Sequence, residues 1–202
     1  MSSEPVQVGC VIQDLTSPPS RPAPIGLCRL RLQTPTIKIR KMIQRRAHDV
    51  IPNVLTVVRE LADGRTLWPL YLHGPVGTGK TCAALAVCDM VSLPFHATVE
   101  EMADAILDRG RCPWILDPGR LEGYDLAVLD ELGARERPTD LNYQAVKLFA
   151  DRRDGSPAIF VSNLTPHQLR DVYDDRIASR VLCGTILELG GPDRRMLRSN
   201  EA

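Results

Sequence analysis

The sequence predicts an α/β fold built on a mostly parallel, doubly wound sheet. Short apolar runs alternate with segments of helical periodicity, which is the pattern of repeated strand–helix units. Several runs are apolar at successive positions, and this is typical of strands covered on both faces. Residues 74–81 form a glycine-rich segment between a predicted strand and a predicted helix. Segments in this position bind phosphate groups in many α/β proteins.

Each element has its own local signal. Residues 38–63 predict a helix with a break near Pro52, because apolar residues recur at every third or fourth position. Strands are predicted at residues 67–72, 94–98, 125–129, 158–161 and 185–189. Helices are predicted between them at residues 81–91, 100–107 and 142–152.

Composition narrows the class of protein. Hydrophobic residues make up 44% of the 202-residue chain, which is enough for a buried core and excludes a wholly disordered protein. No apolar run reaches the roughly 18–20 residues that span a bilayer, and the N-terminus lacks the pattern of a secretory signal. The six cysteines are scattered, as is typical of free thiols in a reducing compartment. We therefore expect a cytoplasmic protein that does not contact a membrane.

The N-terminal part differs in composition from the rest. Residues 1–35 contain six of the 16 prolines and predict a flexible, proline-rich basic arm, whereas residues 36–202 have the pattern of a globular domain. Between Asp14 and Asp49 there are eight lysines and arginines and no acidic residue. Such a segment fits an anionic partner, either nucleic acid or an acidic protein face, or it is only a solvated tail.

The most specific motif is GPVGTGKT at residues 74–81, which fits G-x-x-x-x-G-K-[ST] at every defined position. Its glycines allow backbone amides to surround phosphate oxygens at a helix N-terminus. We expect Lys80 to reach the β- and γ-phosphates of ATP and the Thr81 hydroxyl to bind Mg²⁺. A chance glycine-rich turn is the alternative, and the flanking strand and helix argue against it. The expected nucleotide-binding residues are Gly74, Pro75, Val76, Gly77, Thr78, Gly79, Lys80 and Thr81.

Polar residues follow two other predicted strands. Asp130 and Glu131 come after the apolar run at 125–129. The pair fits a Walker B motif, in which Asp130 holds Mg²⁺ through water and Glu131 activates the attacking water as general base. Two ordinary surface acids are the alternative. Asn163 follows the strand at 158–161 and would orient the same water if this strand lies between the other two, or it is a turn residue.

Two arginines near the C-terminus are further candidates. Arg176 and Arg180 are four residues apart and so share one face of a helix. An arginine from a neighbouring subunit can neutralise charge that develops on the γ-phosphate. An exposed helix with paired charges is the alternative, and the spacing of the two arginines leaves both interpretations open.

Five segments together resemble one family. They read GPVGTGKT at 74–81, DLAVLDELG at 125–133, FVSNL at 160–164, RIASRV at 176–181 and GPDRR at 191–195. In this order they resemble the AAA+ helicase loaders of the DnaC/DnaI type and the closely related IstB-like transposition ATPases. The resemblance covers about residues 40–198. It implies a P-loop NTPase fold of the AAA+ class without a separate C-terminal lid.

The resemblance also implies roles for single residues. Asn163 matches the sensor-1 residue, and Arg180 matches the arginine finger, with Arg176 beside it. Arg195 matches the sensor-2 arginine, which contacts the nucleotide. Arg194 departs from the pattern, because the family often has an aromatic residue there. An arginine finger implies that the chain forms a homo-oligomer.

The function implied by the resemblance is ATP-dependent loading of a hexameric replicative helicase onto single-stranded DNA in bacterial or phage replication. ATP would be hydrolysed to ADP and phosphate, with Mg²⁺ as the metal cofactor. The alternative is an IstB-like ATPase that binds duplex DNA and delivers a transposase. A third reading, a P-loop kinase for small molecules, would leave the Asp130–Glu131 pair and the later asparagine and arginines without a role.

Overall fold

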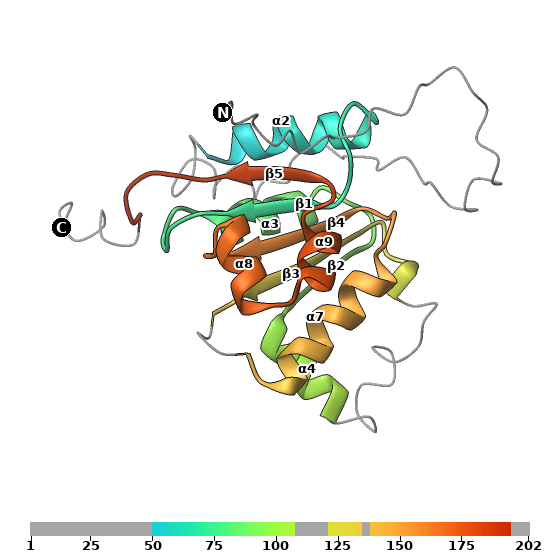
Figure 1. Ribbon diagram of the computed structural model, residues 1–202. Helices are drawn as coiled ribbons and strands as arrows, with labels where there is room; N and C mark the ends of the chain where they lie inside the picture. The colour runs from blue at the N-terminus through green and yellow to red at the C-terminus, as the bar shows by residue number, and fades with distance from the viewer. Residues whose placement is uncertain (1–49, 108–120, 135–137, 195–202) are drawn as a thin grey trace, which may run out of the picture.

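A five-stranded parallel sheet forms the centre of the structure, a computed structural model that describes residues 50–107, 121–134 and 138–194 (Figure 1). The strands lie in the order β2-β3-β4-β1-β5, and every neighbouring pair is parallel. Their bounds are β1 Leu70–His73, β2 Pro94–Thr98, β3 Leu126–Leu132, β4 Ala158–Ser162 and β5 Thr185–Glu188. The predicted arm at residues 1–35 lies outside the described residues.

Helices cover both faces of this sheet. One face packs against α2 (Ile51–Ala62) and α3 (Lys80–Cys88). The other packs against α4 (Val99–Leu107), α7 (Asp140–Arg152), α8 (Pro166–Val172) and α9 (Asp175–Val181). In Figure 1, α7, α8 and α9 lie in front of the sheet and α3 lies behind it. This arrangement confirms the predicted doubly wound α/β class.

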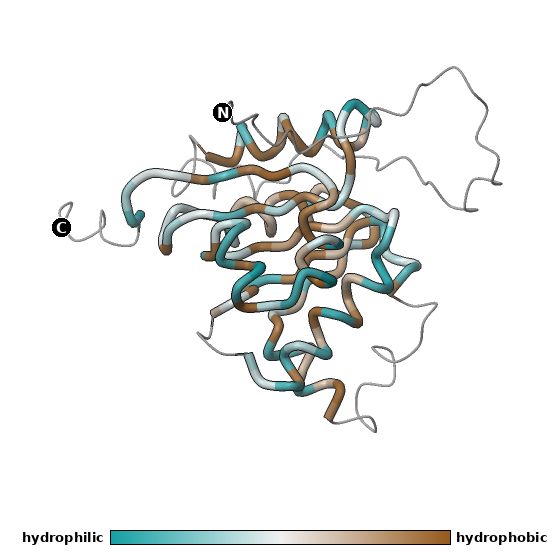
Figure 2. The backbone as a smooth tube through the Cα atoms, viewed as in Figure 1, coloured by the Kyte–Doolittle hydropathy of each residue, from teal (hydrophilic) through white to brown (hydrophobic). Residues whose placement is uncertain are grey.

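The alternation of side chains along β1 shows why residues 70–72 are all apolar. Leu70 and Leu72 belong to the core under α2 and α3, whereas Tyr71 belongs to the core under α4 and α7. All three are fully buried. Figure 2 shows mostly apolar strands in the centre and hydrophilic residues on the outer turns of α2. A strand covered on both faces needs apolar residues at every position, which is the pattern in the sequence.

Local capping explains where two helices begin. Thr139 accepts a hydrogen bond from the amide of Asn142, whose side chain binds back to the Thr139 amide, so α7 starts with a capping box. Thr165 and Gln168 form the same motif at the start of α8. Helix α8 was not predicted from the sequence, although Thr165 is followed by a proline and then, at the third position after it, by a glutamine, which together signal a helix start.

A buried arginine stabilises the end of the sheet opposite the strand C-termini. Arg153 is only 3% exposed, and its Nη1 donates to the carbonyl oxygens of Leu121 at 2.9 Å and Tyr124 at 3.0 Å. Its Nη2 donates to the carbonyl oxygen of Pro157. Burial lowers the pKa of Arg153 to about 10, so the side chain is charged at neutral pH. One cation therefore ties together the segments that precede β3 and β4.

We expect Arg153→Met to lower the free energy of unfolding by about 3 kcal/mol, because buried carbonyls would lose their charge-assisted donors. Urea denaturation measures this change. Arg152→Met is the matched control, since Arg152 is partly exposed and lies 3.7 Å from the Glu122 carboxylate. Exposed ion pairs of this kind contribute less than about 1 kcal/mol. Equal effects of the two substitutions would contradict the role assigned to Arg153.

Candidate nucleotide-binding site

The glycine-rich loop lies between β1 and α3, as the motif requires. Gly77 has φ 80° and Gly79, the N-cap of α3, has φ 97°, and both values favour glycine. At Gly74 a Cβ atom would lie 2.1 Å from the carbonyl oxygen of Leu189, so no side chain fits there. The loop therefore turns tightly from the strand into the helix N-terminus, where backbone amides favour an anion.

Lys80 is held against this loop. The side chain is buried, and its Nζ donates to the carbonyl oxygens of Gly74 and Pro75, each at 2.7 Å. The Thr78 hydroxyl donates to the same Pro75 oxygen at 2.9 Å. The ammonium group is thus kept beside the loop by weak neutral acceptors, which phosphate oxygens can replace.

Asp130 faces the helix that follows the loop. It is 3% exposed, and His96 Nε2 lies 3.5 Å from its Oδ2. Burial alone would raise the pKa of Asp130. His96, the Glu131 amide and the Thr81 hydroxyl lower it by more than burial raises it, so the pKa lies below its usual range. The Asp130 carboxylate is therefore charged at neutral pH and lies next to the hydroxyl predicted to share Mg²⁺ with it.

These residues fit a magnesium ion. The carboxylate of Asp130 and the hydroxyl of Thr81 are hard oxygen ligands, and Mg²⁺ in nucleotide sites takes few protein ligands besides water and phosphate. Among the described residues, no group of three or more His, Cys, Asp and Glu side chains forms a metal site. A magnesium ion here would thus depend on the nucleotide for part of its ligand shell.

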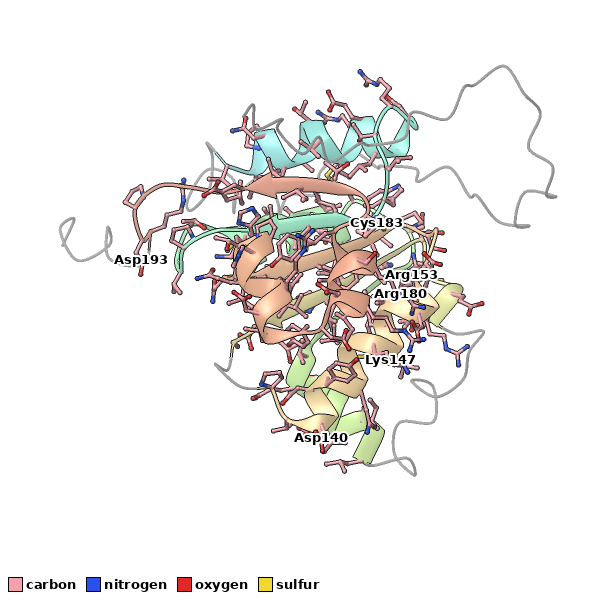
Figure 3. The ribbon with its side chains drawn as sticks, viewed as in Figure 1. Asp140, Lys147, Arg153, Arg180, Cys183 and Asp193 are labelled. Atoms are coloured by element: carbon pink, nitrogen blue, oxygen red, sulfur yellow. The ribbon has the colours of Figure 1, made fainter. Side chains whose placement is uncertain are left out.

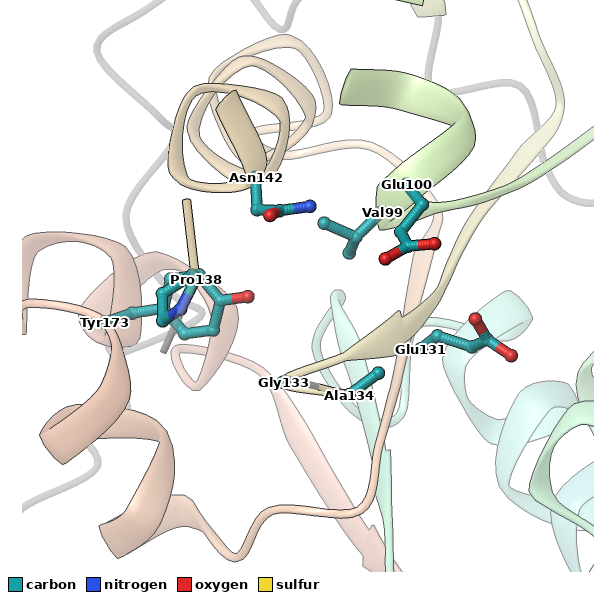
Figure 4. A pocket seen from close by; sticks show the side chains of 8 residues that line it. All are labelled: Val99, Glu100, Glu131, Gly133, Ala134, Pro138, Asn142 and Tyr173. Carbon is teal, nitrogen blue, oxygen red and sulfur yellow. The ribbon is translucent and has the colours of Figure 1, made fainter. Parts of the chain in front are cut away.

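A bulge at the end of β3 points the side chains of Asp130 and Glu131 into different surroundings. Leu129 and Leu132 pack in the same core, although a regular strand would point them to opposite faces. Between them Glu131 has φ 61°, which costs a residue with a side chain about 1–3 kcal/mol. The bulge leaves Asp130 buried and turns Glu131 outward into solvent. Figure 4 shows the Glu131 carboxylate pointing away from Tyr173 and Pro138 on the rim of a small pocket.

Asn163 is exposed directly after β4, and β4 lies between β1 and β3. This is the strand order that its predicted role requires. The Ser162 hydroxyl donates to the Leu132 carbonyl at 2.6 Å and accepts from the Leu164 amide at 3.0 Å. Ser162 therefore joins the ends of β3 and β4 and fixes the backbone on both sides of Asn163. The role of Asn163 in orienting water stays a prediction.

Arg180 does not reach this site within its own chain. Arg180 forms an ion pair with Asp151 of α7. In Figure 3, Arg180 lies on the opposite side of the view from Asp193, which contacts the glycine-rich loop. Arg176 is exposed in the first turn of α9. Arg195 lies outside the described residues.

Three contacts of the site were not predicted from the sequence. His96 lies beside Asp130, and its Nε2 is buried without a hydrogen bond. Arg194 binds two carbonyl groups of the glycine-rich loop, and the Asp193 carboxylate lies against Gly77. Sequence spacing gives no signal for these contacts, because they join residues from distant segments.

Comparisons with known proteins concern the fold. The sequence matches no protein-family model and no curated protein. Among solved structures the chain is similar to DnaI, with a TM-score of 0.56, 21% identity and coverage of 77% of this chain and 93% of that chain. The DnaC helicase loader has a TM-score of 0.56 and 17% identity, with coverage of 70% of this chain and 92% of that chain. The replication initiator DnaA bound to AMPPCP and single-stranded DNA has a TM-score of 0.61 and 19% identity, with coverage of 80% of this chain and 53% of that chain.

The chain has the parallel α/β fold of these structures, which is the AAA+ fold. It spans 50% of the length of the similar DnaA from Aquifex aeolicus, which was solved with AMPPCP. Among the described residues, no helix is long and apolar enough to cross a membrane.

Proposed function

We propose that this AAA+ chain binds ATP together with Mg²⁺ and hydrolyses it to ADP and phosphate. The observation that carries the proposal is the meeting of two motifs at the carboxyl edge of the sheet. The Thr81 hydroxyl at the end of the loop lies close enough to the Asp130 carboxylate of β3 to lower the pKa of that carboxyl group. Ligands of parallel α/β sheets bind at this edge.

The side chains then have distinct roles in hydrolysis. Loop amides and Lys80 bind the phosphates, and Thr81 and Asp130 hold the magnesium ion, which neutralises phosphate charge when bound. The outward-turned Glu131 accepts a proton from the attacking water, and Asn163 orients that water by a hydrogen bond. Arg180, which is remote from its own loop, is supplied to the site of a neighbouring copy.

The substrate of the ATP-driven step is, in our proposal, a helicase. Two similar structures are DnaI and the DnaC helicase loader, and a third is an initiator solved with single-stranded DNA. They support a replication role in the cytoplasm, in which ATP binding assembles copies of the chain with single-stranded DNA and a hexameric replicative helicase. Hydrolysis would then release the complex. No observation in the described residues favours delivery of a transposase instead.

We expect Glu131→Gln to keep ATP binding within about threefold of wild type and to slow hydrolysis at least about 100-fold, because an amide of the same shape is no base. Radiolabelled ATP measures both quantities. Glu100→Gln is the matched control, since Glu100 lines the same pocket as Glu131. Wild-type hydrolysis by the Glu131 variant would show that Glu131 is not the base.

The Glu131→Gln variant also tests whether the partner is a replicative helicase. Because it holds ATP, immobilised Glu131→Gln protein with ATP should retain the host's replicative helicase and single-stranded DNA longer than with ADP. Wild-type protein should release both as ATP is consumed. Equal retention with ATP and ADP, while ATP binding is intact, would overturn the loader role and leave the ATPase proposal standing.

A further inference from the structure

The segment after β5 runs along the glycine-rich loop. The Leu189 amide donates to the His73 carbonyl at 2.7 Å, which brings the chain to the start of the loop. Further on, the Arg194 amide donates to the Gly77 carbonyl at 3.1 Å, and Arg194 Nε donates to the Thr78 carbonyl at 3.1 Å. Arg194 thus binds two successive carbonyl groups in the middle of the loop.

Because the peptide bond is planar, these two contacts also fix the direction of the amides that share a plane with the bound carbonyls. In a trans peptide, the carbonyl oxygen and the amide hydrogen point to opposite sides. The amides of Thr78 and Gly79 share their peptide planes with the two carbonyls that Arg194 holds, so their hydrogens point away from Arg194. Neither amide donates to another protein group within the described residues. Both donors are therefore oriented and available to a phosphate.

We propose that Arg194 is a positioning residue that sets the orientation of the P-loop amides for phosphate binding. The inference rests on the proposed nucleotide-binding function and adds a residue to it. Arg194 acts on the loop from outside, through the carbonyl groups, and does not need to touch the nucleotide. Its effect therefore falls on the phosphates that ATP and ADP share, because the loop amides surround these phosphates.

Three substitutions separate the hydrogen bond from the charge. The Nε2 atom of glutamine and the Nε atom of arginine are the same number of bonds from Cα, so Arg194→Gln keeps a hydrogen-bond donor at the Nε position without the charge. Lysine has a carbon atom at this position, so Arg194→Lys keeps the charge without that donor. Alanine removes both. The backbone amide of residue 194 still donates to Gly77 in all three.

The test measures dissociation constants of the fluorescent nucleotides mant-ATP and mant-ADP on the full chain. We expect Arg194→Ala to weaken both about tenfold, the effect of losing one charge-assisted hydrogen bond. Arg194→Gln should stay within about threefold of wild type, and Arg194→Lys should resemble Arg194→Ala. The kcat at saturating ATP should change less than about twofold, since binding and chemistry are affected separately. Arg170→Ala, an exposed arginine of α8, is the control.

Each contrary result has its own meaning. Weakening of mant-ATP alone would show that Arg194 contacts the γ-phosphate directly and would overturn the inference. Rescue by lysine and not by glutamine would show that charge matters and not the orientation of the loop, which also overturns it. If wild type binds mant-ATP and Arg194→Ala binds it equally well, only this inference fails. If wild type binds neither nucleotide, the proposed function fails and the inference fails with it.

Discussion

Lys80→Ala is expected to weaken ATP binding at least about 100-fold, which corresponds to about 2.7 kcal/mol of binding free energy. Lys80 is the only lysine or arginine among residues 74–81, and its ammonium already lies beside the loop on the carbonyl oxygens of Gly74 and Pro75. A charge-assisted bond to phosphate is stronger than these neutral contacts, so nucleotide binding takes the ammonium from them. Isothermal titration calorimetry with ATP and Mg²⁺ measures the loss.

Lys147→Ala is the matched control, because Lys147 is a partly exposed lysine of α7, in the helical layer on the other face of the sheet. It should bind ATP as wild type does. Urea denaturation without nucleotide separates a binding defect from unfolding, since Lys80 is buried and its removal also changes the loop. A folded Lys80→Ala protein with wild-type affinity would show that the loop does not bind ATP through this residue.

The fold was predictable because its signals are local. The strands β1, β3, β4 and β5 each contain a short apolar run, and two-sided burial explains why residues 70–72 and 126–129 are apolar at every position. In β2 the buried Phe95 and Ala97 alternate with less buried residues. The glycine-rich motif identified its own loop in the same way. The helix α8 was missed because its seven residues are too few to show a period, although its capping box was readable.

The sequence motifs propose residues for the candidate site, but they do not specify its geometry. Sequence order placed Asp130 and Glu131 together after a strand, whereas the structure puts both on β3 and separates them by a bulge. The left-handed conformation of Glu131 has no sequence signal, because glycine or asparagine usually occupies this region. The contacts of His96 and Arg194 depend on strand order and chain path, which no local pattern specifies.

Arg180→Ala is expected to leave ATP affinity within about threefold of wild type and to lower turnover at least about 100-fold. The physical reason is its location. Arg180 lies at the end of the sheet remote from its own P-loop (Figure 3). As the proposed finger it would therefore act on the nucleotide of a neighbouring copy, on charge that develops in the transition state. Steady-state ATP hydrolysis at saturating nucleotide measures the loss.

Mixing inactive variants tests whether Arg180 acts between copies. Lys80→Ala subunits keep the finger and lack the site, and Arg180→Ala subunits keep the site and lack the finger. In a ring of equally mixed subunits, about a quarter of the interfaces join a complete site to a complete finger, so part of the activity should return. Activity that stays at the level of the separate variants would show that Arg180 does not act between copies.

The ion pair with Asp151 provides the control that separates catalysis from structure. Asp151→Ala removes the partner of Arg180 within the chain and leaves the finger in place. If Arg180 is only structural, both substitutions should lower the free energy of unfolding by a similar amount, below about 1 kcal/mol for a half-exposed pair, and should affect turnover equally. If Arg180 is the finger, Asp151→Ala should keep turnover while Arg180→Ala loses it. The ion pair then holds the finger only until a neighbouring copy presents a nucleotide, whose phosphates attract the guanidinium more strongly than one exposed carboxylate does.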